Sequence, residues 1–279
     1  MKEYFYGWYM KCQSDKDTFC VIPAVHKGRK GKTCSIQVIV NDSVFNVDFA
    51  GDKFIQSGDR IIIGDNIFCR PGIKLALKEA GLSLNGMLRF KNPAPLCYDI
   101  MGPFKAVPFM ECRHMVFSMQ TEVYGKLCIN GKEYVFNNAK GYWEGDKGCS
   151  FPKRYIWSHC FFDEGSIMFS VADIPMFGIN FTGVIGVIRW RNKEYRLATY
   201  LGAKAVVICN GRIRIVQGNL ELDVILCKKG GKPLNAPLNG CMTRVIHENT
   251  HGSAFFGFKK KGKTLFAFET DRAAFEYEF

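Results

Sequence analysis

The same order of short alternating segments occurs twice along this chain of 279 residues. In both halves apolar and polar residues alternate in short runs separated by Gly, Asn and Asp, which is typical of antiparallel strands joined by tight turns. Long helical periodicity is absent, so the sequence predicts an all-β protein. The predicted strands are 35–40, 45–49, 74–78, 83–90, 133–136, 166–172, 181–190, 195–200, 205–209, 212–216, 220–226, 253–258, 264–268 and 273–277.

Five blocks keep their order in both halves, which indicates an internal duplication. The paired blocks are Thr18–Pro23 with Met168–Pro175, Ser35–Phe49 with Gly183–Tyr200, Ile61–Leu77 with Ala205–Leu226, Asn92–Leu96 with Asn235–Leu238, and Gly125–Glu144 with Ser253–Glu278. A closed sheet of about eight strands has no free edges and can hold one small ligand. We therefore expect a tandem pair of lipocalin-like antiparallel β-barrels, one over residues 1–147 and one over residues 148–279.

Length and hydropathy favour two domains without a membrane span. A chain of this length suits two cores better than one small core, and no apolar segment is long enough to cross a bilayer. The first twelve residues, MKEYFYGWYMKC, carry charges at Lys2, Glu3 and Lys11. They therefore lack the apolar stretch of a signal peptide, and a cytoplasmic location is expected.

Cysteines and basic residues are abundant, and each group has a simple interpretation. Most of the 12 cysteines, such as Cys20, Cys128 and Cys209, lie in apolar runs without any Cys-x-x-Cys pair, so we expect reduced and mostly buried thiols. The net charge of +12 is concentrated in 27–32, 228–232 and 259–263. These runs are interleaved with glycine and fit solvated turns. Contact with an anionic membrane is the alternative; no nucleic-acid partner is expected, because no reading motif is present.

The densest candidate site is the central stretch 141–162, where Glu144 and Asp146 lie among Tyr142, Trp143 and Phe151. A carboxyl group in an apolar wall tends to keep its proton, and a neighbouring carboxylate strengthens that tendency. Glu144 and Asp146 are therefore candidate acids, with the three aromatic residues as substrate contacts. The alternative is a salt bridge to one of the nearby cations Lys147, Lys153 and Arg154.

Two tryptophans extend this candidate site. His159 follows Trp157 by two residues, so on a strand both side chains point to the same face. An indole wall and a proton-handling imidazole would then share a pocket, although simple core packing fits equally. Trp8 occupies the corresponding strand of the first half and is interpreted as the repeat mate of Trp157.

Other polar clusters carry weaker signals. His247 to His251 spells H-E-x-x-H, which binds zinc only on a helix; here it is expected in a turn between strands, and no metal is predicted. The charged run from Glu111 to His114 follows the Pro-containing segment GPFKAVPF and is expected to pair with itself. Glu269 and Asp271 are expected at a strand end, paired with Arg272.

Three segments together resemble the tocopherol cyclase-like family: GWYMK near the start, DIMGPFKAVPFMECRH (99–114) and GYWEGDKGCSFPKRYIW (141–157). The resemblance also covers SVADIP and TLFAFETDRAAFEYE. It implies a two-barrel lipocalin-like fold that needs no cofactor or metal. It further implies ring closure begun by protonation of a prenyl double bond, with Glu144 or Asp146 as the acid. Trp8, Trp143 and Trp157 would shield the cation.

Two positions depart from the family pattern. Lys147 stands where the family usually has an aromatic residue, and His159 and Phe161 stand where it commonly has Gln and Asn. These departures point to another substrate or to no catalysis. The sequence therefore predicts a protein that binds an isoprenoid or similar lipophilic molecule and cyclises it. The alternative is a non-catalytic carrier or sensor of the same fold.

Overall fold

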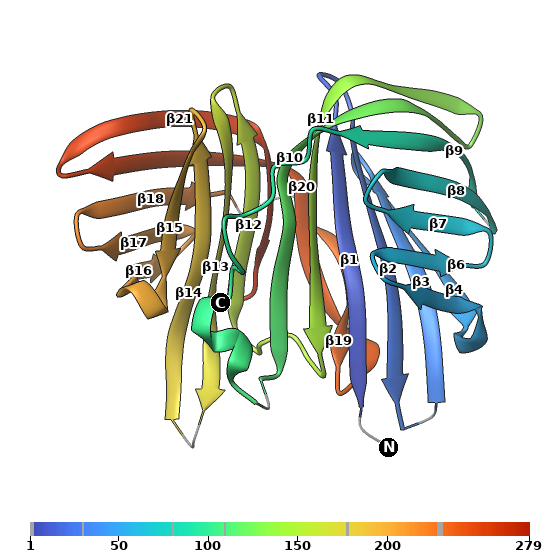
Figure 1. Ribbon diagram of the computed structural model, residues 1–279, viewed down its shortest axis with the longest axis horizontal. Helices are drawn as coiled ribbons and strands as arrows, with labels where there is room; N and C mark the ends of the chain where they lie inside the picture. Colours follow the sequence, from blue (N-terminus) through green and yellow to red (C-terminus); the bar gives the residue numbers. More distant parts are fainter. Residues whose placement is uncertain (1–2, 30, 80, 109, 177–178, 228–230) are drawn as a thin grey trace. The chain divides into compact units, whose positions relative to one another are not determined.

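The computed structural model describes residues 3–29, 31–79, 81–108, 110–176, 179–227 and 231–279. Its strands form two antiparallel sheets, one of 11 and one of 10 strands, which confirms the all-β prediction (Figure 1). Three short 3-10 helices, η1 (Gly51–Lys53), η2 (Gly102–Ala106) and η3 (Thr199–Leu201), are the helical elements of the described residues.

The first sheet has the order β4-β3-β2-β1-β11-β10-β9-β8-β7-β6-β5. In Figure 1 strands β6–β9 cross the direction of β1–β4 steeply, as expected for a strongly bent sheet. Its strands are β1 (Tyr4–Gln13), β2 (Thr18–Gly28), β3 (Gly31–Val40), β4 (Ser43–Ala50), β5 (Phe54–Ser57), β6 (Arg60–Ile63), β7 (Asn66–Cys69), β8 (Gly72–Glu79), β9 (Leu82–Lys91), β10 (Cys112–Ile129) and β11 (Lys132–Gly148).

The second sheet has the order β15-β14-β13-β12-β21-β20-β18-β17-β16, and β19 also pairs with β20. In sheet order, the nine strands from β4 to β7 of the first sheet each have a counterpart here, which confirms the duplication. The predicted pairing of Ile61–Leu77 with Ala205–Leu226 is wrong by one strand, because β16, β17 and β18 take the positions of β7, β8 and β9. Its strands are β12 (Tyr155–Phe162), β13 (Gly165–Met176), β14 (Ile179–Trp190), β15 (Lys193–Ala198), β16 (Lys204–Cys209), β17 (Arg212–Gln217), β18 (Leu220–Leu226), β19 (Lys232–Leu238), β20 (Cys241–Lys260) and β21 (Lys263–Tyr277).

Each sheet encloses its own apolar core because alternate residues of its strands point inward. In the first unit Ile36 and Val38 of β3 pack with Ile73 and Leu75 of β8, from the far end of the same sheet. The second unit buries a corresponding set that includes Ile213 of β17. Each sheet is therefore bent around its core, as expected for a barrel-like unit, but no strand ladder closes either sheet among the residues described.

The chain divides into two compact units that are not simple halves. Unit 1 contains residues 1–96, 110–151 and 235–244, and unit 2 contains 97–109, 152–234 and 245–279. The main division therefore falls shortly after the expected boundary at 147/148, and each unit also takes a short segment from the other half of the chain. The segment before β10 belongs to unit 2, where Arg196 donates to the carbonyl oxygens of Tyr98 and Asp99.

Two local expectations about polar clusters are wrong. His247–His251 lies inside strand β20, not in a turn, so its histidines are not one helical turn apart. Glu269 and Asp271 lie inside β21 instead of at a strand end. In both places the chain continues as strand through polar residues, because cross-strand hydrogen bonds do not depend on apolar side chains.

The cysteine expectation needs correction. All 12 cysteines are free thiols, but only Cys12, Cys20, Cys34 and Cys160 are buried; Cys209 is exposed and Cys128 is half-buried. The described residues 27–29 and 31–32 of the first basic run and the run 259–263 do lie at hairpin turns, whereas residue 30 and residues 228–230 of the third run lie outside the described residues. No described helix is both long and apolar enough to cross a bilayer.

Candidate functional site

A bulge in strand β10 shapes the polar part of unit 1. Val116, Ser118 and Thr121 of β10 lie opposite Glu144, Trp143 and Gly141 of β11, so β10 uses more residues than β11 over this span. Such a bulge bends the strand and redirects its side chains. The corresponding strand of unit 2 has a similar shift, with Asn249 and Gly252 opposite Phe275 and Ala273.

Alternation along β11 divides the predicted site between two faces of the sheet. Trp143 belongs to the apolar core of unit 1, together with Trp8 and Met10 of β1. Tyr142, Glu144 and Asp146 have the opposite parity and therefore point to the other face. This differs from the expectation that the two carboxylates border the same apolar cavity as Trp143.

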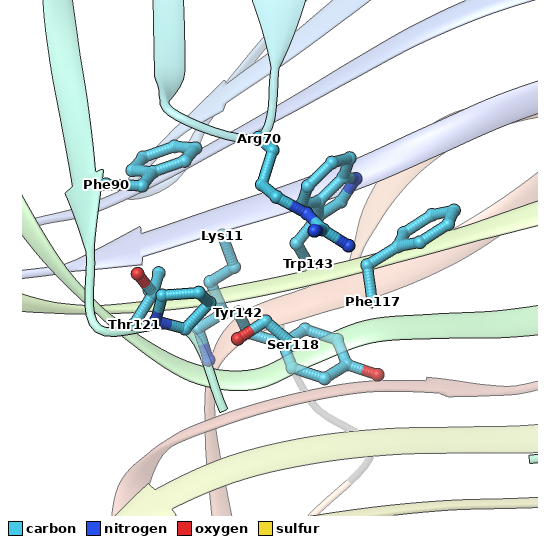
Figure 2. A pocket seen from close by; sticks show the side chains of 10 residues that line it. Lys11, Arg70, Phe90, Phe117, Ser118, Thr121, Tyr142 and Trp143 are labelled. Atoms are coloured by element: carbon cyan, nitrogen blue, oxygen red, sulfur yellow. The ribbon is translucent and has the colours of Figure 1, made fainter. Parts of the chain in front are cut away.

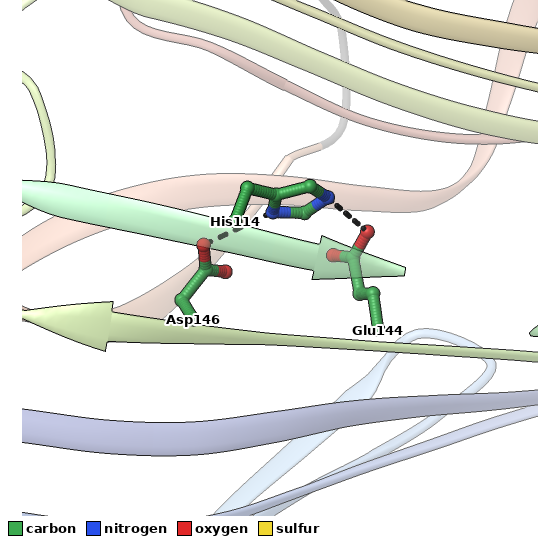
Figure 3. Close-up of side chains that lie close together, drawn as sticks. All are labelled: His114, Glu144 and Asp146. Carbon is green, nitrogen blue, oxygen red and sulfur yellow. Dashed lines mark hydrogen bonds and ion pairs between the residues drawn. The ribbon is translucent and has the colours of Figure 1, made fainter. Parts of the chain in front are cut away.

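His114 of β10 joins the two carboxylates into one cluster (Figure 3). Its Nε2 lies 3.1 Å from Oε2 of Glu144, and its Nδ1 lies 3.0 Å from Oδ1 of Asp146. The Tyr142 hydroxyl donates to the same Glu144 oxygen. The Cys112 thiol donates to Oδ1 of Asp146 at 3.3 Å. Tyr142, Glu144, His114 and Asp146 thus form a continuous chain in which the His114–Glu144 link is an ion pair and the other two links are hydrogen bonds.

The cluster is buried, with exposed fractions of 1% for Tyr142, 4% for Glu144 and 8% for His114. Burial alone would lower the pKa of His114, but the charges of Asp146 and Glu144 outweigh it and raise that pKa to about 10. Burial raises the pKa of Glu144 despite the opposing charge of His114. Burial and the Glu144 charge also raise the pKa of Tyr142. The cluster therefore holds its protons strongly.

The same three side chains carry atoms that could act as metal ligands. One ligand atom from each of His114, Glu144 and Asp146 lies within 4.8 Å of the others. However, the two imidazole nitrogens face different carboxylates, so the ring lies between the acids and does not share a common centre with them. A metal would have to displace at least one of these contacts. The arrangement fits a proton-conducting chain better than a coordination site.

A cleft in unit 1 lies beside this chain (Figure 2). The space between its walls measures about 340 Å³ with open solvent included, and the cavity proper, about 10 Å³, has room for about one water molecule. The walls combine aromatic rings with a few polar side chains. The lining residues are Lys11, Arg70, Phe90, Pro93, Phe117, Ser118, Thr121, Gly141, Tyr142 and Trp143.

Tyr142 connects the cleft to the buried cluster. It is a lining residue of the cleft, and its hydroxyl bonds to Glu144. The bulge at Ser118 and Thr121, both lining residues, brings the cleft to this point of β11. A ligand in the cleft would therefore contact a residue that is hydrogen-bonded to the buried carboxyl.

The remaining predicted site residues lie in three places. Trp8 packs in the core of unit 1, with its ring centroid 4.9 Å from that of Trp143. Phe151, also in unit 1, makes an edge contact with Phe5 at 5.5 Å. Trp157 and His159 lie on β12 of unit 2 and share one face, as predicted.

The proposed pairing of Trp8 with Trp157 is wrong. Trp157 lies opposite Glu276, and the equivalent place in unit 1, opposite Glu144, belongs to Tyr9. Trp8 points into its core cluster, whereas the core of unit 2 receives Ile156, the neighbour of Trp157 in sequence. A shift of one residue reverses the face of a strand side chain, and no feature of the two short motifs reveals that shift.

A histidine takes the place of the lysine or arginine that the alternative interpretation gave Glu144 and Asp146 as a salt-bridge partner. Glu144 and Asp146 bond to His114, whereas Arg154 pairs with Asp173 at 3.4 Å. The run from Glu111 to His114 does not only pair with itself, because its histidine reaches β11. Arg70, Phe90 and Phe117 were not predicted as site residues. Their approach depends on the bend of the sheet and on the bulge in β10, which sequence periodicity does not report.

Three solved structures share the fold of this chain. A protein of Nitrosomonas europaea assigned as an AttH matches 100% of this chain and 93% of its own, with a TM-score of 0.58 at 10% identity. Kievitone hydratase from Nectria haematococca matches 99% of this chain and 89% of its own, with a TM-score of 0.57 at 9% identity. CghA solved with Sch210972 matches the same shares, with a TM-score of 0.63 at 9% identity.

The similarity at these identities concerns the fold. No protein-family model matches the chain, and no curated protein matches it. The resemblance to the tocopherol cyclase-like family therefore stays a prediction from the sequence motifs.

Proposed function

We propose that this protein binds a small lipophilic molecule in the cleft of unit 1 and transfers a proton to it from the buried cluster. The observation that carries the proposal is the continuous chain from the cleft-lining Tyr142 through Glu144 and His114 to Asp146. Relatives in fold include a hydratase of kievitone and a protein solved with Sch210972. Both names fit small organic ligands.

The reaction we propose is the intramolecular cyclisation of a prenylated quinol or related alkene. Protonated Glu144 gives its proton to an alkene carbon, and Tyr142, whose hydroxyl bonds to Glu144, holds that carboxyl in place. The neighbouring carbon becomes a cation, and a hydroxyl oxygen of the same substrate captures it. The proton released from that hydroxyl returns to the cluster, so substrate and product are isomers. The raised pKa of Glu144 supplies the protonated carboxyl that the first step needs.

The test is an incubation with a prenylated quinol in D₂O, followed by chromatography and mass spectrometry. The expected product is the chromanol, carrying one deuterium at the carbon that is protonated. Tyr142→Phe and Glu144→Gln should each lower turnover by about 100-fold, the usual size of an acid–base contribution.

Glu276→Gln is the matched control, because Glu276 of unit 2 also accepts a hydrogen bond from a buried tyrosine, Tyr155. That variant loses the same kind of buried bond and should keep turnover. Full turnover in Tyr142→Phe and Glu144→Gln would contradict the assigned roles.

A non-catalytic carrier is the second candidate. Its support is that His114 contacts both carboxylates, so the cluster satisfies itself without a ligand. In that case the native protein binds the quinol but yields no deuterated product over any incubation time. Binding to Glu144→Gln would then equal binding to the native protein.

A further inference from the structure

The charged residue types that line the cleft are all basic. Aromatic rings of Phe90, Phe117 and Trp143 form much of its wall, and its charged lining residues, Arg70 and Lys11, are both cations. No carboxylate is among the described residues that line it. Figure 2 shows the Arg70 side chain extending toward the region of the Phe117 and Trp143 rings.

Arg70 is held only weakly by the protein itself. Its Nε lies 4.0 Å from Oδ2 of Asp59, and the two side chains are 66% and 68% exposed. An exposed pair of this kind contributes about 0–1 kcal/mol. The guanidinium can therefore exchange Asp59 for a ligand oxyanion at little cost.

The hydroxyl protons in the cleft wall are already engaged. Ser118 donates to the carbonyl oxygen of Gln120 at 2.7 Å, and Thr121 donates to that of Lys91 at 2.6 Å. The Tyr142 hydroxyl donates to Glu144. Among these lining groups, Arg70 is thus the donor best placed to choose between ligands.

We infer that the cleft selects lipophilic molecules that carry a carboxylate, with the apolar body against the aromatic wall and the carboxylate on Arg70. A guanidinium binds a carboxylate through two parallel hydrogen bonds, and a neutral ester cannot replace that charge-assisted contact. This inference rests on the proposed function, because it names the class of ligand for the same cleft.

The experiment compares a prenylated benzoic acid with its methyl ester, because the two share one apolar body. Binding is measured by equilibrium dialysis to the full-length protein. We expect the acid to bind about tenfold more tightly than the ester. Arg70→Gln should abolish this preference. Arg70→Lys should retain part of it, because it keeps the charge but loses the planar fork.

Arg89→Gln is the matched control, since Arg89 is an exposed arginine of β9 outside the cleft lining and its loss changes the net charge equally. This variant should keep the preference for the acid. Equal binding of acid and ester to the native protein would overturn the inference and leave the proposed function standing. A preference that survives in Arg70→Gln, or is lost in Arg89→Gln, would also overturn it. Binding of neither compound would also overturn the inference, whereas the proposed function is tested separately by turnover of the prenylated quinol.

Discussion

His114 is the residue that sets the charge of the buried cluster. It places a cation between Glu144 and Asp146, at 3.1 and 3.0 Å from their oxygens. Without the imidazole, two carboxylates would lie buried near one another with only hydroxyl and thiol donors beside them. Glu144, whose pKa burial already raises, would then hold its proton more strongly still.

The pH dependence of stability should reveal this histidine. Its pKa rises from an ordinary value of 6.5 to about 10 in the folded protein. Because folding raises the pKa of His114, its protonated form stabilises the folded protein fully below pH 6.5, and this stabilisation is lost as the pH rises toward 10. The free energy of unfolding, measured with denaturant, should fall by on the order of a few kcal/mol across that window. His114→Asn should flatten the slope; an unchanged slope would show that His114 is neutral in the fold.

His26 should produce the opposite effect on the acid side. Burial lowers its pKa from 6.5 to about 4, and its Nε2 lies 3.0 Å from Oγ of Ser35. A lowered pKa means that the unfolded chain takes up the proton first, so stability is present above pH 6.5 and is lost as pH falls to 4. The loss should be at most about 3 kcal/mol.

The comparison of two variants separates these histidines. Denaturant unfolding of His26→Gln should lose the acid slope and keep the alkaline one, whereas His114→Asn should do the reverse. If His26→Gln retained the native acid slope, other groups would have to account for the loss of stability at low pH.

At the scale of elements, the sequence predicts strands well and their faces poorly. Alternating residues in β3, β8 and β14 mark these strands because each has one apolar face toward a core. Strand β10 itself was not predicted, since its polar start follows an irregular Pro-containing segment. Its bulge also cannot be read from alternation. Trp143 and Glu144 lie on different faces because they are neighbours on β11, whereas the bulge and the register of β1 on β11 decide which residues each of them lies opposite.

Gly141 should be required where the bulge meets β11. A Cβ added there would lie 2.5 Å from Cγ2 of Thr121 and 2.7 Å from Cγ2 of Val123. Both neighbours are β-branched and stiff at χ1, so Gly141→Ala should force β10 outward. We expect a loss of roughly 1–3 kcal/mol in denaturant unfolding, typical of overpacking. Adding Thr121→Ser, which removes one clashing methyl, should recover part of it. No recovery would mean that the strain lies elsewhere.

At the scale of the whole molecule, the duplication was predictable because each repeat carries the same order of strands and turns. The assignment of residues 97–109 to unit 2 and of residues 235–244 to unit 1, an exchange of short segments between the two halves of the chain, was not predictable. Residues 235–244 belong to unit 1, although they lie in the second half of the sequence. Their assignment depends on contacts with residues far away in the chain, such as Gln37, and no local pattern encodes these contacts.

This exchange predicts that the first half of the chain is incomplete by itself. The Gln37 side chain is 1% exposed and makes two hydrogen bonds of 2.9 Å with the backbone of Asn235. Two backbone bonds add to these, from Phe151 N to the Pro237 carbonyl at 3.1 Å and from Gly240 N to the Cys149 carbonyl at 2.7 Å. A buried polar group without its partner costs about 1–3 kcal/mol, a large part of the roughly 5–15 kcal/mol that stabilises a domain.

Residues 1–151 alone should therefore unfold at much lower denaturant concentration than the same fragment joined to 235–244 by a Gly/Ser linker. Gln37→Ala should lower the stability of the joined fragment, since it leaves the backbone of Asn235 unpaired, and should matter little in residues 1–151 alone. A control fragment joined to the same linker followed by a scrambled 235–244 sequence separates specific docking from the effect of a tail. Equal unfolding midpoints for all three fragments would mean that unit 1 folds without the exchanged segment.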